Sequence, residues 1–217
     1  MRAPSSVTGG LLSHLLSTAR RLGAATIYES AGRSGALPSV IRPLVDGLHL
    51  CGPAFPVALA PSNNLWLHRA IYQARPGDVL VASTGESYEA GYWGEVMTHA
   101  AICRGLAGLV IDGCVRDRRR IAALRFPVFC RGTCIRGTRK EDFRGTGFSE
   151  IQLGDTAVRI GDLVVGDGDG VVVVPRDTVS LVMKRALIRQ KEEAKIIRRL
   201  RRGARTIDLY RLQGAIQ

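Results

Sequence analysis

The sequence lacks several features that would assign it to a familiar class. Its uncharged apolar runs, such as VVVVP at 171–175, are far shorter than the roughly 20 residues that a membrane span needs. The four histidines show no HxH or HExxH spacing, which disfavours a histidine-based zinc site. The five cysteines are an odd number without a CxxC pair, so we expect reduced thiols rather than disulfides or a zinc knuckle.

The N-terminus has no acidic residue before Glu29, a bias that it shares with transit peptides. Its apolar stretch LLSHLL at 11–16 is too short and too interrupted for a secretory signal core. We expect residues 1–15 to form a loose arm. We also expect a cytoplasmic protein that makes no membrane contact.

Positive charge is in excess, with a formal net charge of +12. Much of it lies between Lys184 and Arg205, a segment with ten Lys or Arg and two Glu. Such a balance permits a nucleic-acid or acidic partner. However, no aromatic residue is interleaved in this segment to stack on bases. We interpret the charge as a solvated helix face and do not expect nucleic-acid binding.

The 217 residues are 46% apolar, which is enough to bury a substantial core. Between residues 51 and 132, short apolar runs that indicate buried strands alternate with helical periodicity. This order is typical of βαβ crossovers with parallel strands. We expect strands at 51–61, 79–83, 106–113 and 126–132, and helices at 17–30, 63–74, 94–104 and 118–126.

After residue 150 the pattern changes. Short apolar runs separated by Gly-Asp turns predict antiparallel hairpins up to residue 176. A long helix then follows, for which Asp177 is the expected N-cap. Its apolar stripe is longer than one small domain needs, so we expect an oligomer. We divide the chain into the arm, a domain at 16–176, and a C-terminal helix and tail at 177–217 that we place at a subunit interface.

Charged residues stand where the strand at 106–113 ends. Arg116 and Asp117 follow this strand, and Glu95 begins a helix after the Gly-rich loop that follows the strand at 79–83. Ligands of α/β sheets gather outside the carboxyl ends of parallel strands, so these side chains converge if the two strands are neighbours. The helix N-terminus and the arginine would bind a carboxylate. The acidic pair would suit Mg²⁺ or Mn²⁺.

A purely structural interpretation of the same residues stays open. Asp117 precedes RRRIAAL and would serve as an ordinary helix cap. Glu95 in a first helical turn would simply complement the helix dipole. We expect the neighbouring Tyr92 and Trp93 to wall the pocket or to form a subunit contact.

The runs GEVMTHAAICRGLAGLVIDGCVRD at 94–117 and FPVFCRGT at 126–133 resemble the signature of the RraA-like family. This family includes the 4-hydroxy-4-methyl-2-oxoglutarate/4-carboxy-4-hydroxy-2-oxoadipate aldolases and the RraA regulators of ribonuclease E. Its aldolases carry an acidic residue, twenty intervening positions and Arg-Asp, as Glu95 and Arg116-Asp117 do here. Many of them have Asp where this chain has Glu95, a departure that lengthens the reach toward a metal-bound water. Segments such as PGDVLV and GDLVVGDGDGVVVVP extend the resemblance over nearly all of the chain after about residue 15.

The resemblance implies an α/β fold, a swivelling three-layer β/β/α domain with a long C-terminal helix, assembled as homotrimers or homohexamers. It implies that backbone N–H groups of Gly94, Glu95, Val96 and Met97 bind a pyruvate-like substrate. Arg116 would bind its carboxylate or keto oxygen, and Asp117 would hold the divalent metal. In the aldolases a glutamate from a neighbouring subunit's C-terminal helix also reaches the site. Here the candidates are Glu192 and Glu193.

The expected activity is therefore cleavage of a 4-hydroxy-2-oxo acid by a class II-type, metal-dependent aldolase that releases pyruvate. Oxaloacetate decarboxylation is the expected side activity because it passes through the same enolate. No lysine lies near the motif to form a Schiff base, which disfavours the covalent route. The alternative is a non-catalytic, protein-binding regulator of RNA processing like the RraA proteins.

Overall fold

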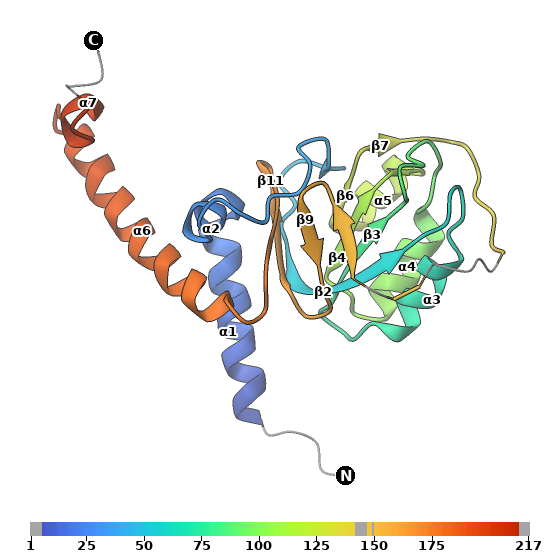
Figure 1. Cartoon of the computed structure of the whole chain (residues 1–217). Helices are drawn as coiled ribbons and strands as arrows, with labels where there is room; N and C mark the ends of the chain where they lie inside the picture. The colour runs from blue at the N-terminus through green and yellow to red at the C-terminus, as the bar shows by residue number, and fades with distance from the viewer. Residues whose placement is uncertain (1–5, 142–146, 149, 213–217) are drawn as a thin grey trace.

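The computed structural model describes residues 6–141, 147–148 and 150–212 (Figure 1). The strands in this part of the chain are β1 (Arg42–Pro43), β2 (Leu50–Ala58), β3 (Val79–Ser83), β4 (Gly108–Asp112), β5 (Cys114–Val115), β6 (Val128–Cys130), β7 (Gly132–Thr133), β8 (Ile151–Leu153), β9 (Thr156–Val158), β10 (Leu163–Asp167) and β11 (Gly170–Val174). Seven of them form one sheet in the order β1-β6-β4-β3-β2-β10-β11. β2, β3, β4 and β6 pair in parallel, as expected, and the added strands pair antiparallel.

The helices of the described residues are α1 (Ser6–Leu22), α2 (Ala24–Ser30), α3 (Leu65–Gln73), α4 (Glu95–Cys103), α5 (Arg118–Leu124), α6 (Val179–Leu200) and α7 (Thr206–Leu209). Helices α3, α4 and α5 pack on one face of the sheet, and the β8–β9 hairpin packs on the other. The layers of helices, central sheet and β8–β9 hairpin confirm the three-layer α/β fold that the family resemblance implies. Helices α1, α2 and α6 pack outside β10 and β11 (Figure 1).

The central strands are buried on both faces because each contributes to two cores. In β3, Leu80 and Ala82 contact the core beneath the helices, whereas Val79 and Val81 contact the core beneath the hairpin. This alternation is the two-residue period of an extended strand. Residues 83 and 112, the last of β3 and β4, pair with each other, so the segments that follow both strands leave the sheet side by side.

The helix expected over 17–30 is interrupted. Gly23 has a φ of 79°, and α2 begins at Ala24, whose N–H donates to Asp167 Oδ2 at 2.7 Å. A cap supplied by Asp167, the last residue of β10, thus lies at the start of α2. Of the expected N-terminal arm, residues 6–15 lie in α1, and residues 1–5 lie outside the described residues.

Helix α6 confirms the expected long C-terminal helix, but Asp177 is not its cap. Thr178 occupies the N-cap position, and its side chain makes no capping hydrogen bond. Val182, Met183 and Ala186 are buried against the neighbouring helices. Farther along, Ile188 and Ile197 are 58% and 47% exposed. None of the helices described is long and apolar enough to cross a membrane.

Candidate functional site

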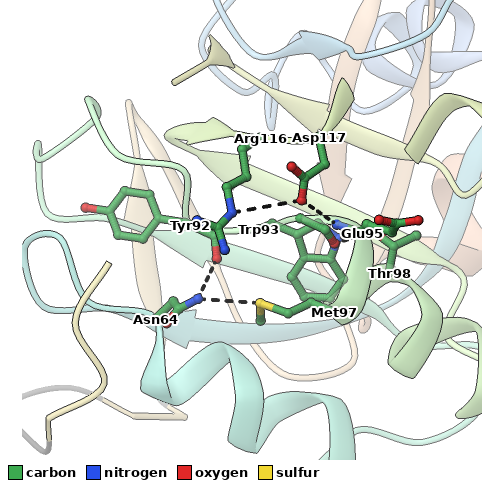
Figure 2. Close-up of polar contacts among 9 residues, drawn as sticks. Asn64, Tyr92, Trp93, Glu95, Met97, Thr98, Arg116 and Asp117 are labelled. Carbon is green, nitrogen blue, oxygen red and sulfur yellow. Dashed lines mark hydrogen bonds and ion pairs between the residues drawn. The ribbon is translucent and has the colours of Figure 1, made fainter. Parts of the chain in front are cut away.

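Two chain segments meet beyond the carboxyl ends of β3 and β4. The first site segment, residues 84–95, leads from β3 into α4, and the second, residues 112–117, leads from β4 into α5. Hydrogen bonds join them at five points along their length: Thr84 Oγ1 to Asp112 O at 2.7 Å, Cys114 N to Tyr88 O at 3.0 Å, Tyr92 N to Cys114 O at 3.1 Å, Arg116 N to Trp93 O at 2.8 Å and Glu95 N to Asp117 Oδ2 at 3.1 Å. The structure therefore brings Glu95, Arg116 and Asp117 together (Figure 2).

Glycines allow this close approach. A Cβ atom on Gly113 would lie 2.7 Å from Thr84 Cγ2, and one on Gly94 would lie 2.5 Å from Asp117 Oδ2. Both distances are too short for a real side chain. The backbone and side chains of the two site segments are thus packed as closely as glycine permits.

Asp117 lies at the N-cap position of α5 in the left-handed region, with φ 60° and ψ 35°. Few residues other than glycine adopt this conformation, although Asp and Asn tolerate it best. Its side chain makes no capping hydrogen bond to α5 and instead accepts the first N–H of α4. The helix-cap interpretation therefore holds for the backbone position of Asp117 but not for its carboxylate.

Arg116 is only loosely paired with this carboxylate. Its Nε lies 3.9 Å from Asp117 Oδ2, and the two side chains are 49% and 39% exposed. Exposed pairs at such a distance contribute little stability, so both groups remain available to a ligand. Glu95 sends its own carboxylate toward Arg120, with Oε1 3.3 Å from Nη1.

A cavity of about 530 Å³ opens beside Arg116 and Asp117. The residues that line it are Arg116, Asp117, Arg118, Thr133, Cys134 and Ile135. Its volume suits a small organic acid. The amides of Val96 and Met97 belong to the first turn of α4, where a helix offers no acceptor of its own. The side chain of Val96 is 79% exposed, whereas the buried side chains of α4 are those of Met97, Thr98 and Ala101.

Two aromatic residues of the first site segment pack in the core adjacent to the site. Tyr92 and Trp93 are fully buried in the core beneath the helices, so the expectation that they wall the pocket or a subunit contact is wrong. Trp93 Nε1 donates to Thr98 Oγ1 at 2.7 Å, and Thr98 Oγ1 donates to Gly94 O at 2.9 Å (Figure 2). Asn64 Nδ2 donates to Tyr92 O at 2.9 Å. The sequence analysis missed Thr98, although its spacing of four from Gly94 permits this contact.

The thiol in the second site segment is poorly suited to act as a nucleophile. Burial raises the pKa of Cys114, and the nearby Glu89 carboxylate raises it further. The thiol therefore stays protonated at neutral pH. Burial also raises the pKa of Cys130 to about 11.

The sequence matches the model of the RraA-like family, described as Aldolase/RraA, over residues 24–173. The chain belongs to the RraA-like family. It is 38% identical over 161 residues to a protein of Halalkalibacterium halodurans named "Putative 4-hydroxy-4-methyl-2-oxoglutarate aldolase". The aligned residues cover 72% of this chain and 74% of that protein. The family expected from the sequence is thereby confirmed.

Solved structures share this RraA-like fold. An uncharacterized protein from Pseudomonas syringae superposes with a TM-score of 0.80 at 29% identity, covering 93% of this chain and 94% of the other. Streptomyces coelicolor RraAS2, described as an unusual member of the RNase ES inhibitor RraA protein family, superposes with a TM-score of 0.74 at 27% identity, covering 85% and 98%. The family thus includes relatives named for two different activities.

Glu192 does not join the site within one RraA-like chain. It lies on α6, at the opposite end of the molecule from α4 and α5 (Figure 1). Glu193 Oε1 lies 2.8 Å from Arg189 Nε of the same helix, so this carboxylate already has a partner. Glu192 is exposed, which leaves it as the better candidate for a contribution from another copy.

The donors at the site restrict which metal ion it would suit. Across residues 6–141, 147–148 and 150–212, no group of three or more His, Cys, Asp or Glu side chains is arranged to hold a metal. Asp117 offers a carboxylate beside the cavity, and Cys134, which also lines it, does not form a group of three metal ligands with Asp117 among the described residues. A hard cation such as Mg²⁺, which keeps several waters and binds through one or two carboxylates, fits this donor set.

Proposed function

We propose that this chain is a divalent-metal-dependent aldolase that cleaves a 4-hydroxy-2-oxo acid and releases pyruvate. The observation that carries the proposal is the juxtaposition of Arg116 and Asp117 with the N-terminus of α4 beside a cavity. The similarity to relatives named as aldolases supports the choice of reaction. We expect substrates of the 4-hydroxy-4-methyl-2-oxoglutarate or 4-carboxy-4-hydroxy-2-oxoadipate type.

The 2-oxo acid end of the substrate is bound by positive groups of this chain. The amides of Val96 and Met97 in the first turn of α4, and that of Gly94 at its N-cap, would direct their N–H groups and the positive end of the helix dipole toward a carboxylate, whereas the Glu95 N–H already donates to Asp117 Oδ2. The planar guanidinium of Arg116 donates two parallel hydrogen bonds to a carboxylate or keto oxygen. Binding at both points orients the C3–C4 bond for cleavage.

The proposed reaction is a retro-aldol cleavage. A base removes the proton of the C4 hydroxyl, the C4 carbonyl forms, and the C3–C4 bonding pair moves into the enolate of pyruvate. Arg116 stabilises the negative charge that develops on the C2 oxygen. Glu95, at the same helix start, is our candidate to accept and return the proton through water. Protonation of C3 then yields pyruvate.

Asp117 would hold the divalent cation, Mg²⁺ or Mn²⁺. The cation supplies Lewis-acid stabilisation of the enolate. Loss of CO₂ from C4 of oxaloacetate produces the same enolate, so oxaloacetate decarboxylation is the side activity that we expect.

A homotrimer or homohexamer is part of the proposal. The exposed apolar side chains of α6, Ile188 and Ile197 among them, would be covered by another copy. Glu192 would reach the site of a neighbour from the same helix and act in catalysis there. Light scattering measures the assembly, and a stable monomer at micromolar concentration would exclude both the assembly and the contribution of Glu192 to a neighbour's site.

Pyruvate release tests the function directly. Coupling to lactate dehydrogenase reports turnover of oxaloacetate and of 4-hydroxy-4-methyl-2-oxoglutarate, first in EDTA and then with added Mg²⁺ or Mn²⁺. We expect no turnover in chelator and recovery with either metal. Full turnover in EDTA would exclude the metal mechanism, and no pyruvate from either substrate under any condition would exclude the aldolase.

A second candidate function is a non-catalytic regulator that binds a protein of RNA processing. The likeness to Streptomyces coelicolor RraAS2, whose description names an RNase ES inhibitor family, favours it. Titration of a purified ribonuclease of that class with this chain measures inhibition. Inhibition without pyruvate release would favour the regulator over the aldolase.

A further inference from the structure

Arg131 connects the two site segments from a third part of the chain. It lies between β6 and β7, and its Nε donates to Asp112 Oδ1 at 2.6 Å. Its guanidinium carbon lies 3.5 Å from the centroid of the Tyr88 ring. Asp112 belongs to the second site segment and Tyr88 to the first, so one side chain contacts both.

These contacts are shielded from water. The side chains of Arg131 and Asp112 are only 23% and 11% exposed, so their attraction is weakly screened. Removing one partner of such a pair leaves the other charge without compensation. The backbone contributes as well, since Arg131 N donates to Gly113 O at 3.0 Å. Arg131 is thus fixed to the second site segment at two successive residues.

Only an arginine makes both side-chain contacts at once. Its planar guanidinium donates in the plane to Asp112 while one face stacks on Tyr88. A lysine at this position would keep the charge, but it has no planar face to stack. The combination of contacts therefore depends on the shape of the group and not only on its charge.

The geometry points to Arg131 as a positioning residue that clamps Asp112 to Tyr88 and thereby fixes Arg116 and Asp117 against the N-terminus of α4. The clamp acts at Asp112, where the first of the hydrogen bonds between the two site segments is made. Asp112 lies four residues before Arg116 in the second site segment. Loss of the clamp loosens the backbone that presents Arg116 and Asp117. A displacement of about 1 Å in a site can reduce activity roughly a hundredfold. As an account of catalysis, the clamp rests on the proposed function.

The kinetic test compares variants that remove one contact at a time. Arg131→Lys and Tyr88→Leu each abolish the stacking, and we expect kcat/KM for oxaloacetate to fall about tenfold, with KM raised because Arg116 is misplaced. Tyr88→Phe retains the ring and should match the wild type. The double variant Arg131→Lys/Tyr88→Leu should be little worse than either single variant because the pair acts as one unit. Arg119→Lys, an exposed arginine on α5, is the matched control and should leave kinetics unchanged.

Amide hydrogen exchange tests the clamp without reference to catalysis. In Arg131→Lys, or in Tyr88→Leu if the first variant fails to fold, amides of residues 88–95 and 112–117 should exchange about tenfold faster, while those of β2 keep wild-type rates. Wild-type exchange in both site segments would overturn the clamp, and so would an equal acceleration in β2, which indicates global destabilisation. If the wild type releases no pyruvate, the proposed function fails, yet selective acceleration still establishes the clamp.

Discussion

The two ends of this molecule are built in opposite ways. At the site end, the two site segments are hydrogen-bonded to each other and are supported by the buried Tyr92 and Trp93. At the other end, α6 contacts α1 and α2 near its start, and its later apolar side chains remain exposed. The site end is held by hydrogen bonds within the chain, whereas the other end presents apolar side chains with no cover from the described residues.

The difference indicates which parts of the proposed function one chain contains. Contacts within the chain hold Arg116 and Asp117 at the site. Glu192 lies on α6, away from that site, and would reach it only from a second copy. Covering Ile188 or Ile197 would contribute roughly 1.5–3 kcal/mol for each fully buried side chain, which favours association through α6.

Among the substitutions at the site end, Asp117→Asn should lower the activity most. Asn tolerates the left-handed backbone, and its side-chain oxygen can still accept the Glu95 N–H, so the geometry survives. The negative charge that would hold the cation is lost. We expect kcat/KM for oxaloacetate to fall roughly a hundredfold or more and the response to added Mg²⁺ to disappear. The helix-dipole contribution lost is only about 0.3–1 kcal/mol, so the melting temperature should fall by a few degrees at most.

Asp177→Asn is the matched control for this experiment. Asp177 also precedes a helix, but its side chain is 88% exposed and lies at the α6 end. Its replacement should change neither kinetics nor the metal response. A similar loss in both variants, or an Asp117→Asn protein with a normal metal response, would mean that Asp117 has no special role.

Arg116→Lys should have the next largest effect. Lysine keeps the charge beside the cavity but cannot donate two parallel hydrogen bonds. Charge-assisted hydrogen bonds contribute roughly 1.5–3 kcal/mol each, so kcat/KM should fall about ten- to a hundredfold. Stability should barely change, because the side chain is half exposed and only loosely paired. Steady-state kinetics measure kcat/KM, and a thermal melt measures stability. Wild-type kinetics in Arg116→Lys would mean that Arg116 is only a surface charge with no role in substrate binding.

Much of the site end follows from local sequence patterns. The strand at 79–83 is predicted correctly because a short β-branched run between turns has few alternatives. The convergence of Glu95 with Arg116 and Asp117 required only that β3 and β4 be neighbours, which a βαβ crossover favours.

The features that the sequence analysis missed depend on residues distant in sequence. The break at Gly23 is accompanied by a cap from Asp167, 143 positions away from Ala24. Tyr92 and Trp93 follow a Gly-rich loop, a context typical of exposed residues, yet tertiary packing buries them completely. Arg131 belongs to the FPVFCRGT run at 126–133, but its partners Tyr88 and Asp112 lie in two other segments of the chain. No local pattern specifies such partners.

Gly94→Ala tests how closely the site segments must approach. The new Cβ would lie 2.5 Å from Asp117 Oδ2, so the carboxylate must move and its bond to Glu95 N is lost. We expect a loss of about tenfold in kcat/KM, similar to that for other groups that orient a metal ligand. Gly137→Ala is the control, because nothing lies within 4 Å of its added Cβ. Equal kinetics in the two variants would show that the close approach is not needed.

The smallest expected effect concerns the α6 end. Glu192→Gln should lower kcat about three- to tenfold if this carboxylate assists proton transfer in a neighbour's site. Glu193→Gln is the matched control: its carboxylate pairs with Arg189, so its loss should cost at most about 0.5 kcal/mol of stability and no activity. Mixing tests whether Glu192 acts between chains. When Asp117→Asn and Glu192→Gln chains are dissociated and reassembled together, some sites combine an intact Asp117 from one chain with an intact Glu192 from the other. Activity above the weighted mean of the separate variants would then appear, because those sites are fully wild-type. Activity equal to that mean would place Glu192 outside every site and would leave the α6 end with a role in assembly alone.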